Sequence, residues 1–161
     1  MTSVLIRALN DADRPAWLGL RQALWMGSDA TTLAAEAGTL LSEPERFGAL
    51  RYGVLLAFQD GRAVGFVEVS LRDDIEGFPG RTVGYIEGVY VEPRGRRHGL
   101  GRALLDEAAR WTKTQGAAQL ASDVLPDNPA SIVFHERCGF RRIGESGSRD
   151  KRQILLLREI A

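Results

Sequence analysis

Hydrophobic residues along the chain follow the two periods that distinguish strands from helices. Short runs rich in Val, Leu, Ile and Phe predict strands. They lie at residues 4–8, 53–59, 62–71, 83–91, 120–124, 141–144 and 153–158. Apolar residues that recur every three or four positions predict helices, which contain residues 17–25, 31–41, 102–116 and 130–138. The resulting order, β-α-α-β-β-β-α-β-α-β-β, is typical of an α/β (α+β) chain with a mixed sheet and helices on both faces.

Turn residues agree with these boundaries. Asp60-Gly61 is a strong signal for a two-residue hairpin between two of the strands. Pro15 fits the first turn of the first helix, and Gly139 fits the stop of the last one. Residues 72–82 contain two glycines and a proline and are predicted to form a loop.

The composition is that of an ordinary globular domain. The chain has 161 residues, of which 44% are hydrophobic and 26% are charged, which fits one domain over residues 1–161. No apolar run reaches the ~20 residues of a membrane-spanning helix, and the N-terminus lacks the apolar stretch of a signal peptide. A single cysteine, Cys138, excludes an internal disulfide. Together these features predict a cytoplasmic protein with no membrane partner.

The formal net charge is zero, but the charges are unevenly distributed. Residues 28–92 contain 11 acidic and 5 basic side chains, whereas residues 93–115 contain 6 basic and 2 acidic ones. The acidic segment suits a cationic ligand, although solvated surface charge explains most of its single residues. The chain has neither the broad basic face nor the motifs of nucleic-acid-binding proteins, so no nucleic-acid partner is expected.

The most informative segment joins a strand to a helix. Residues 96–101 read Arg96-Arg97-His98-Gly99-Leu100-Gly101. A glycine-containing turn that opens a helix exposes backbone N–H groups at the positive end of the helix dipole, and Gly99 and Gly101 let a phosphate approach the backbone. We therefore predict a diphosphate site here. Four arginines add positive charge around it: Arg94, Arg96, Arg97 and Arg102.

A dinucleotide-binding Rossmann motif is the alternative explanation for these glycines. Gly99-x-Gly101 begins like G-x-G-x-x-G, but Leu104 stands where the third glycine or alanine belongs. The motif also follows a hairpin in the middle of the chain instead of opening a first βαβ unit. Both departures disfavour the Rossmann interpretation.

A second motif lies downstream, at Asn128-Pro129-Ala130-Ser131, and is followed by Gly139-Phe140. Together with Arg96-x-x-Gly99-x-Gly101, it resembles the GCN5-related N-acetyltransferase (GNAT) superfamily over residues 83–140. The resemblance implies a mixed, mostly antiparallel sheet of six to seven strands that splays between its fourth and fifth strands. It also implies that acetyl-CoA binds in the V-shaped opening.

Further segments resemble a narrower group, the aminoglycoside 6'-N-acetyltransferases. These segments are residues 20–25, 70–74, 85–91 and 121–123. The resemblance implies that the protein transfers acetyl from acetyl-CoA to the 6'-amine of an aminoglycoside antibiotic, directly, within a ternary complex. Members of this group confer antibiotic resistance and commonly form homodimers, so a homodimer is expected.

Two carboxylates are candidates for handling the acceptor amine. A protonated amine must lose a proton before it attacks a thioester, and a carboxylate can bind the cation and accept that proton. Glu87 lies in the strand before the diphosphate turn, and Asp123 ends the next strand, so a splayed sheet brings both to the thioester. Both match acidic residues of the 6'-acetyltransferases. A glutamate in an apolar strand is costly without a partner, whereas Asp123 is alternatively a turn residue before Pro126.

Gly88 lies in the middle of a strand, where glycine often marks a bulge. A bulge would free a backbone N–H, that of Val89, to bond the thioester carbonyl. The backbone groups of Val89 and Val91 would also pair with the pantetheine amides as an added strand does. The alternative for Gly88 is close packing against a helix.

Three polar residues near the motifs have alternative roles. His135 stands where the wider family has a tyrosine that protonates the departing thiolate, and it is a candidate general acid, a partner of the sulfur, or a packing residue. Asn128 is expected to bond the pantetheine arm, to cap a helix, or both. His98 is expected to contribute a backbone N–H. No His or Cys cluster suggests a metal, and Cys138 is expected to be buried.

Acceptor-binding residues are expected in the acidic loop and at the end of the first helix. Asp73, Asp74 and Glu76 form an acidic cluster, and at least one of Asp73 and Asp74 is expected to line a site that binds a cationic ligand. The alternative is that these side chains are simply solvated. Trp25 is expected to stack on a sugar ring or to border it, with core packing as the alternative. For Trp17, core packing is the expected role.

Two other functions are compatible with the motifs. The first is the same fold acting on another small cationic amine, such as a polyamine, although Trp25 and the matching segments favour a sugar. The second is a non-catalytic acyl-CoA-binding module, which would not require the paired carboxylates Glu87 and Asp123.

Overall fold

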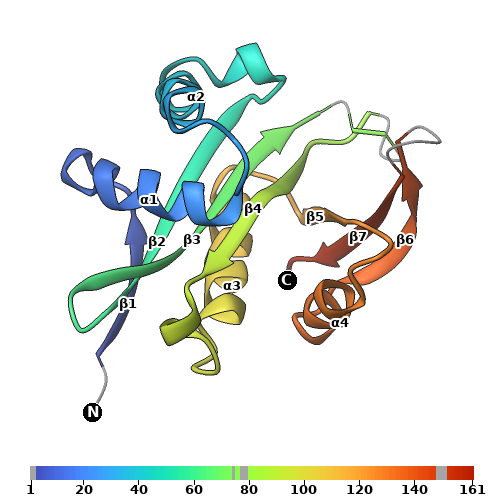
Figure 1. Ribbon diagram of the computed structural model, residues 1–161. Coiled ribbons are helices and arrows are strands. Elements are labelled where there is room, and N and C mark those ends of the chain that lie inside the picture. The colour runs from blue at the N-terminus through green and yellow to red at the C-terminus, as the bar shows by residue number, and fades with distance from the viewer. Residues whose placement is uncertain (1–2, 74, 77–79, 148–151) are drawn as a thin grey trace.

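The computed structural model (Figure 1) describes residues 3–73, 75–76, 80–147 and 152–161. Within these ranges, seven strands form one sheet in the order β1-β2-β3-β4-β5-β7-β6, and β4 with β5 is the only parallel pair. The strands are β1 (Val4–Ala8), β2 (Arg51–Gln59), β3 (Arg62–Arg72), β4 (Val83–Val91), β5 (Gln119–Val124), β6 (Arg141–Ser146) and β7 (Gln153–Glu159). Every strand that the sequence predicted is present.

Helices cover both faces of the sheet (Figure 1). α1 (Arg14–Leu24) and α2 (Ala30–Ser42) pack on one face, and α3 (Leu100–Thr114) packs on the other. α4 (Pro129–Arg137) lies beside β6 and adds side chains to the core under α3. Within the described ranges, no helix is long and apolar enough to cross a membrane.

The two covered faces explain why the central strands are apolar at nearly every position. On β2, Val54 and Leu56 pack under α1 and α2, whereas Leu55 and Ala57 pack under α3. A strand that is buried on both faces has no solvent side and reads as a continuous apolar run. Cys138 lies in the α3 core, buried as the sequence predicted.

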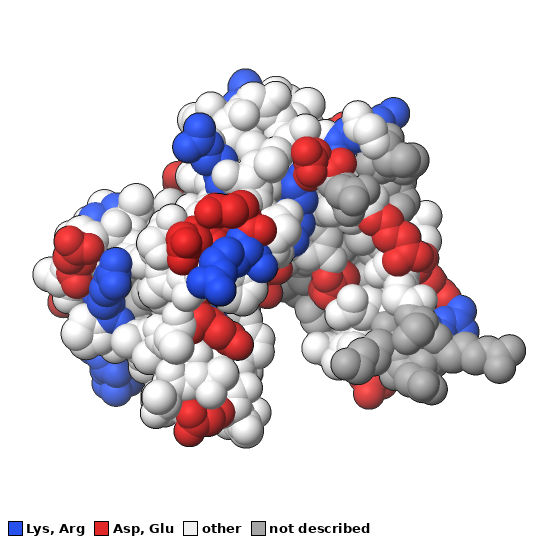
Figure 2. All heavy atoms as spheres, turned by 90° about the horizontal axis from the view of Figure 1, so that it is seen from above, with Lys and Arg blue, Asp and Glu red and all other residues white. Residues whose placement is uncertain are grey.

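The sheet opens between β4 and β5. Only two residue pairs join these strands, Gly84 with Leu120 and Tyr85 with Ala121. Beyond them the strands diverge (Figure 1), so residues 86–91 of β4 have no partner on β5. Figure 2 shows the hollow between the two halves of the molecule, with acidic side chains near its rim. The predicted sheet, mixed, mostly antiparallel and splayed, is confirmed.

A bulge interrupts the pairing of β4 with β3. The register shifts between Glu68 and Val69 of β3, which leaves Glu87 of β4 as the extra residue. A bulge re-aims the side chain at this point and increases the local twist. Gly88 also lets α1 approach, because a Cβ there would lie 2.8 Å from Trp25 Cζ2. Both interpretations of Gly88, a bulge and a helix contact, are therefore confirmed.

A buried ion pair under α1 was not predicted from the sequence. The fully buried carboxylate of Glu68 accepts hydrogen bonds from Arg21 and Tyr52. It also accepts one from Trp17 Nε1 at 3.1 Å. Burial, reinforced by the Glu68 charge, raises the pKa of Tyr52, so its hydroxyl remains a donor. The Arg21 guanidinium lies 4.6 Å from the centre of the Trp25 ring, so the cluster also supports the end of α1.

We expect Glu68→Gln to lower the free energy of unfolding by about 3–5 kcal/mol, because it leaves the buried Arg21 charge without its counter-charge. Urea denaturation followed by tryptophan fluorescence measures this change. Glu36→Gln is the matched control, since Glu36 approaches Arg21 at 3.8 Å from a position that is 44% exposed. Glu36→Gln should lower the free energy of unfolding by less than about 1 kcal/mol. Equal losses in the two variants would show that the buried pair does not stabilise the fold.

Candidate active site

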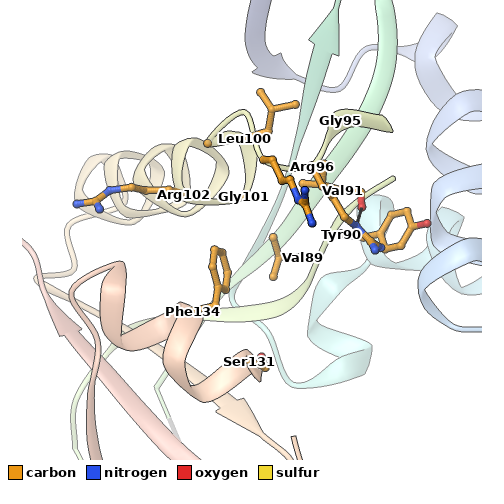
Figure 3. Close-up of a pocket in the computed structure, with 12 residues that line it drawn as sticks. Val89, Tyr90, Val91, Gly95, Arg96, Leu100, Gly101, Arg102, Ser131 and Phe134 are labelled. Carbon is orange, nitrogen blue, oxygen red and sulfur yellow. Dashed lines mark hydrogen bonds between the residues drawn. The ribbon is translucent and has the colours of Figure 1, made fainter. Parts of the chain in front are cut away.

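A pocket of about 440 Å³ lies between β4, the start of α3 and α4 (Figure 3). We call it the β4–α3 pocket. Its lining residues are Val89, Tyr90, Val91, Gly95, Arg96, Arg97, Gly99, Leu100, Gly101, Arg102, Ser131 and Phe134. Most of the predicted diphosphate turn lies on this lining, whereas His98 is exposed and lies outside it.

The turn before α3 places backbone donors at this pocket. Gly99 is the N-cap of α3 with φ of 74°, a conformation that favours glycine. The Ala103 N–H bonds to Gly99 O at 3.0 Å, so the N–H groups of Leu100, Gly101 and Arg102 precede the first intrahelical bond. No side chain among the described residues caps this end. The helix therefore presents N–H groups and the positive end of its dipole to an anion.

Arginine side chains surround the same turn. Arg96 Nε donates to Val91 O at 2.8 Å, and the Arg96 guanidinium lies 5.8 Å from the centre of the Tyr90 ring. Arg97 and Arg102 are exposed on the lining. The pocket is therefore cationic, as an anion site requires, and the use of these arginines for phosphate stays a prediction.

The wall of the pocket that faces the turn before α3 includes the open edge of β4. Val89 lies on this edge, and Figure 3 shows Phe134 of α4 across from it. A Cβ at Gly101 would lie 3.0 Å from Phe134 Cζ, so glycine permits this close packing. Asn128 lies outside the lining and accepts a hydrogen bond from Ser131 N at 3.2 Å as the N-cap of α4. Its capping role is confirmed, and its contact with a ligand stays a prediction.

Glu87 is held by two residues of the neighbouring strand. Its Oε1 accepts hydrogen bonds from Ser70 Oγ at 2.6 Å and from Arg72 Nε at 2.7 Å. Arg72 Nη2 lies 2.6 Å from the same oxygen, and the Glu87 side chain is 24% exposed. The cost of placing a glutamate in an apolar strand is therefore offset by a serine and an arginine.

Two cavities meet at Arg72 and Glu87. The α2-side cavity, of about 340 Å³, is lined by Arg21, Trp25, Ser28, Leu33, Glu36, Leu40, Phe47, Tyr52, Glu68, Arg72 and Glu87. The β7-side cavity, of about 350 Å³, is lined by Gly48, Arg72, Ile75, Glu76, Tyr85, Glu87, Ser146, Gly147, Gln153 and Leu155. Each cavity thus contains at least one carboxylate in addition to Glu87.

Asp123 stands on β5 at the level of Glu87 on β4. Each lies two residues beyond the last β4–β5 pair, Tyr85 with Ala121. The Tyr85 hydroxyl donates a hydrogen bond to Asp123, and Tyr85 lines the β7-side cavity with Glu87. Burial and the bond to Asp123 raise the pKa of Tyr85, so its hydroxyl remains a donor. The two predicted carboxylates therefore both lie where the sheet opens.

His135 is buried, and both of its ring nitrogens are engaged. Nε2 lies 2.9 Å from Ser122 Oγ, and Nδ1 lies 2.8 Å from Ser131 O. The rings of Phe134 and Phe140 pack edge-on against it. Burial lowers the pKa of His135 and favours the neutral ring. Because His135 does not line the β4–α3 pocket, its placement favours the packing role over that of a general acid.

The predicted acceptor residues have different outcomes. Trp25 lines the α2-side cavity, and Trp17 is buried in the core as predicted. Asp73 is exposed and lines neither cavity, while Glu76 of the same loop lines the β7-side cavity. Asp74 lies outside the described residues. Loop position alone therefore did not identify which acid faces the site.

Sequence analysis missed a polar face of β3, formed by Glu68, Ser70 and Arg72. Their spacing of two places them on the same side of the strand, the side on which Phe66 packs under α1 and α2. Polar residues repeated at this period in an otherwise apolar strand were the signal that could have located them. Tyr85, the partner of Asp123, was likewise not assigned a role.

Comparison with known proteins agrees with this geometry. The family model described as the Acetyltransferase (GNAT) family matches residues 14–140. A protein of Stenotrophomonas maltophilia named Aminoglycoside N(6')-acetyltransferase type 1 is 39% identical over 136 residues, which cover 84% of each chain. A protein of the same name from Klebsiella aerogenes is 34% identical over 145 residues, covering 89% of this chain and 93% of its own.

Solved structures give the same result. The aminoglycoside 6'-N-acetyltransferase AAC(6')-IG from Acinetobacter haemolyticus matches with a TM-score of 0.79 and 30% identity, over 91% of this chain and 97% of its own. AAC(6')-Iy in complex with the bisubstrate analogue CoA-S-monomethyl-acetylneamine matches with a TM-score of 0.78 and 30% identity, over 91% and 99% of the two chains. Since the family model also spans most of the sequence, the chain belongs to the GNAT family of acetyltransferases.

Proposed function

We propose that this protein transfers the acetyl group of acetyl-CoA to the 6'-amine of aminoglycosides, directly, with both substrates bound. The family gives the reaction class, and the relatives that cover most of the chain are named for this acceptor. The main structural support is the position of Glu87, two residues from Val89 of the cationic pocket and on the lining of both carboxylate-bearing cavities. An anionic coenzyme suits the first region, and a cationic amine suits the second.

The β4–α3 pocket has the features that acetyl-CoA requires. The N–H groups at the start of α3, together with Arg96, Arg97 and Arg102, would hold the diphosphate. The open edge of β4 at Val89 and Val91 would pair with the amides of the pantetheine arm. The bound coenzyme supplies a thioester that an amine can attack.

Glu87 and Asp123 would hold the acceptor ammonium where β4 and β5 diverge. Glu87 Oε2 then takes a proton from the ammonium, directly or through a water, which leaves the neutral amine to attack the thioester carbon. The Val89 N–H would donate to the thioester oxygen, where negative charge develops. The electron pair of the broken C–S bond remains on sulfur, and the second proton of the attacking nitrogen passes through solvent to this thiolate, which leaves as the free thiol. Because a thiolate is a tolerable leaving group, no acid is required at His135.

Release of free thiol from acetyl-CoA measures this function. We expect release with kanamycin-type aminoglycosides that carry a 6'-amine and none with analogues that carry a 6'-hydroxyl. Spermidine is the comparison acceptor, because a polyamine also suits carboxylate-lined cavities. NMR of the product identifies the acetylated nitrogen.

The outcomes of this assay separate the candidate functions. Acetyl on the 6'-nitrogen supports the proposal, whereas acetylated spermidine beside unreacted aminoglycoside would assign a polyamine substrate. Coenzyme binding without thiol release for any amine would indicate a non-catalytic module. The homodimer stays a prediction, and sedimentation velocity would measure the oligomeric state that tests it.

A further inference from the structure

The Arg72 guanidinium uses all three of its nitrogens inside the site. Nε donates to Glu87 Oε1 at 2.7 Å and to Ser70 Oγ at 3.0 Å, and Nη2 lies 2.6 Å from Glu87 Oε1. Nη1 donates to Phe47 O at 2.9 Å, at the end of the 3-10 turn Pro44–Phe47. Arg72 therefore ties the end of β3 to β4 and to the segment before β2. A Cβ at Gly48 would lie 3.2 Å from Nη1, so this turn closes tightly on the guanidinium.

These contacts distinguish the two oxygens of Glu87. Ser70 is fully buried, and its hydroxyl accepts from Arg72 Nε while it donates to Glu87 Oε1. Oε1 thus takes bonds from two residues, whereas Oε2 takes none from the described part of the chain. Because the Glu87 side chain is 24% exposed and borders both cavities, Oε2 is the oxygen left for a ligand.

We infer that Arg72 is a positioning residue for acetyl transfer: with Ser70 it fixes Oε1 of Glu87, so that Oε2 faces the acceptor amine. The inference rests on the proposed function, in which Glu87 takes the proton. Arg72 acts through Glu87 and not on the substrate. A partly exposed glutamate at a bulge would otherwise sample several rotamers, and a misplacement of about 1 Å costs about 100-fold in rate.

The test compares kcat and KM for Arg72→Ala, Arg72→Lys and Ser70→Ala, with acetyl-CoA and the amine that the wild-type enzyme acetylates. We expect Arg72→Ala to lower kcat by about 100-fold. KM for acetyl-CoA should not change, because Arg72 does not line the β4–α3 pocket. Lysine keeps the charge but lacks the planar fork, so Arg72→Lys should also lose turnover, and Ser70→Ala should lose part of it.

Chemical rescue separates positioning from a folding defect. Millimolar guanidinium should raise kcat of Arg72→Ala, because it can occupy the vacated site beside Glu87, and it should not raise kcat of the wild type. Arg62→Ala is the matched control: Arg62 lies at the other end of β3 and pairs with Glu92 at 3.1 Å. We expect this variant to keep wild-type kcat and to show no response to guanidinium.

Wild-type kcat in both Arg72→Ala and Ser70→Ala would overturn the inference. The inference would also be overturned if the loss of kcat is fully accounted for by a lower Tm of the variants and guanidinium does not restore kcat. If Arg72→Ala does not fold, Arg72→Lys and Ser70→Ala provide the same comparison. If this protein proves to acetylate a different amine, the proposed aminoglycoside substrate is wrong, but the Arg72 variants can still be tested with that amine. Failure of the proposed function and failure of this inference are therefore distinguishable.

Discussion

Glu87→Gln is expected to lower kcat by about 10²- to 10⁴-fold, because an amide oxygen cannot take the proton of the acceptor ammonium. Glutamine has the shape of glutamate, and its carbonyl oxygen can still accept the hydrogen bond from Ser70 Oγ. The loss of kcat therefore measures the missing proton transfer and not a change in the bulge that holds this residue. Steady-state thiol release measures kcat. Titration calorimetry should show unchanged CoA affinity, because Glu87 does not line the β4–α3 pocket.

Asp123→Asn is the companion variant, and Glu107→Gln is the control. We expect Asp123→Asn to lower kcat as well, because asparagine still accepts the Tyr85 hydrogen bond but lacks the negative charge that, in the proposed function, attracts the ammonium. Glu107 pairs with Arg110 on the surface of α3, so its variant should keep full activity. Full activity in both Glu87→Gln and Asp123→Asn would remove the assignment of the base.

The fold was predictable because its signals are local in sequence. The Asp60-Gly61 turn joins β2 and β3 as expected, with both residues at positive φ. Strands buried on both faces gave the continuous apolar runs from which their positions were read. The splay between β4 and β5 was different: it came from a family resemblance, since no residue pattern states how many pairs two parallel strands make.

The candidate site was predictable only where its residues are contiguous. The predicted diphosphate turn spans consecutive residues, so its glycines and arginines could be recognised together. The partners of Glu87 are Ser70 and Arg72, 17 and 15 residues earlier, and only strand pairing brings them to it. The three roles considered for His135 came from its position in the family motif, which does not tell whether the ring is free. Tertiary packing engages both of its nitrogens, which favours the packing role.

Counting charge along the sequence had the same limit. The acidic excess of residues 28–92 suggested a site for a cationic ligand. Yet Arg21, which lies outside that segment, pairs with the buried Glu68 within it. Arg72, from within it, pairs with Glu87. Such pairs neutralise charge at the positions where the site is built. The local potential therefore depends on which acids remain unpaired on the cavity walls, and a count along the chain does not contain that information.

Gly99→Asp is expected to raise the Kd for CoA by about 1,000-fold, because it sets a carboxylate beside the predicted diphosphate. Two like charges about 4 Å apart repel by about 4 kcal/mol at an effective dielectric constant near 20. Volume is not the cause, since a Cβ at Gly99 would meet nothing within 4 Å. Titration calorimetry with CoA measures the change, and circular dichroism should show an intact fold.

Two matched variants isolate the charge at this position from backbone strain. Gly99→Asn has the shape of the aspartate without its charge, and asparagine tolerates the φ of 74° better than most residues, so it should bind CoA far more tightly than Gly99→Asp. Gly61→Asp introduces the same carboxylate at a similar φ of 79°, also with nothing within 4 Å of its Cβ, but in the β2–β3 hairpin. It should leave CoA affinity unchanged. Equal affinities for Gly99→Asp and Gly99→Asn would mean that the diphosphate lies elsewhere, because a negative charge on the N-cap residue of α3 must repel a phosphate bound at the start of that helix.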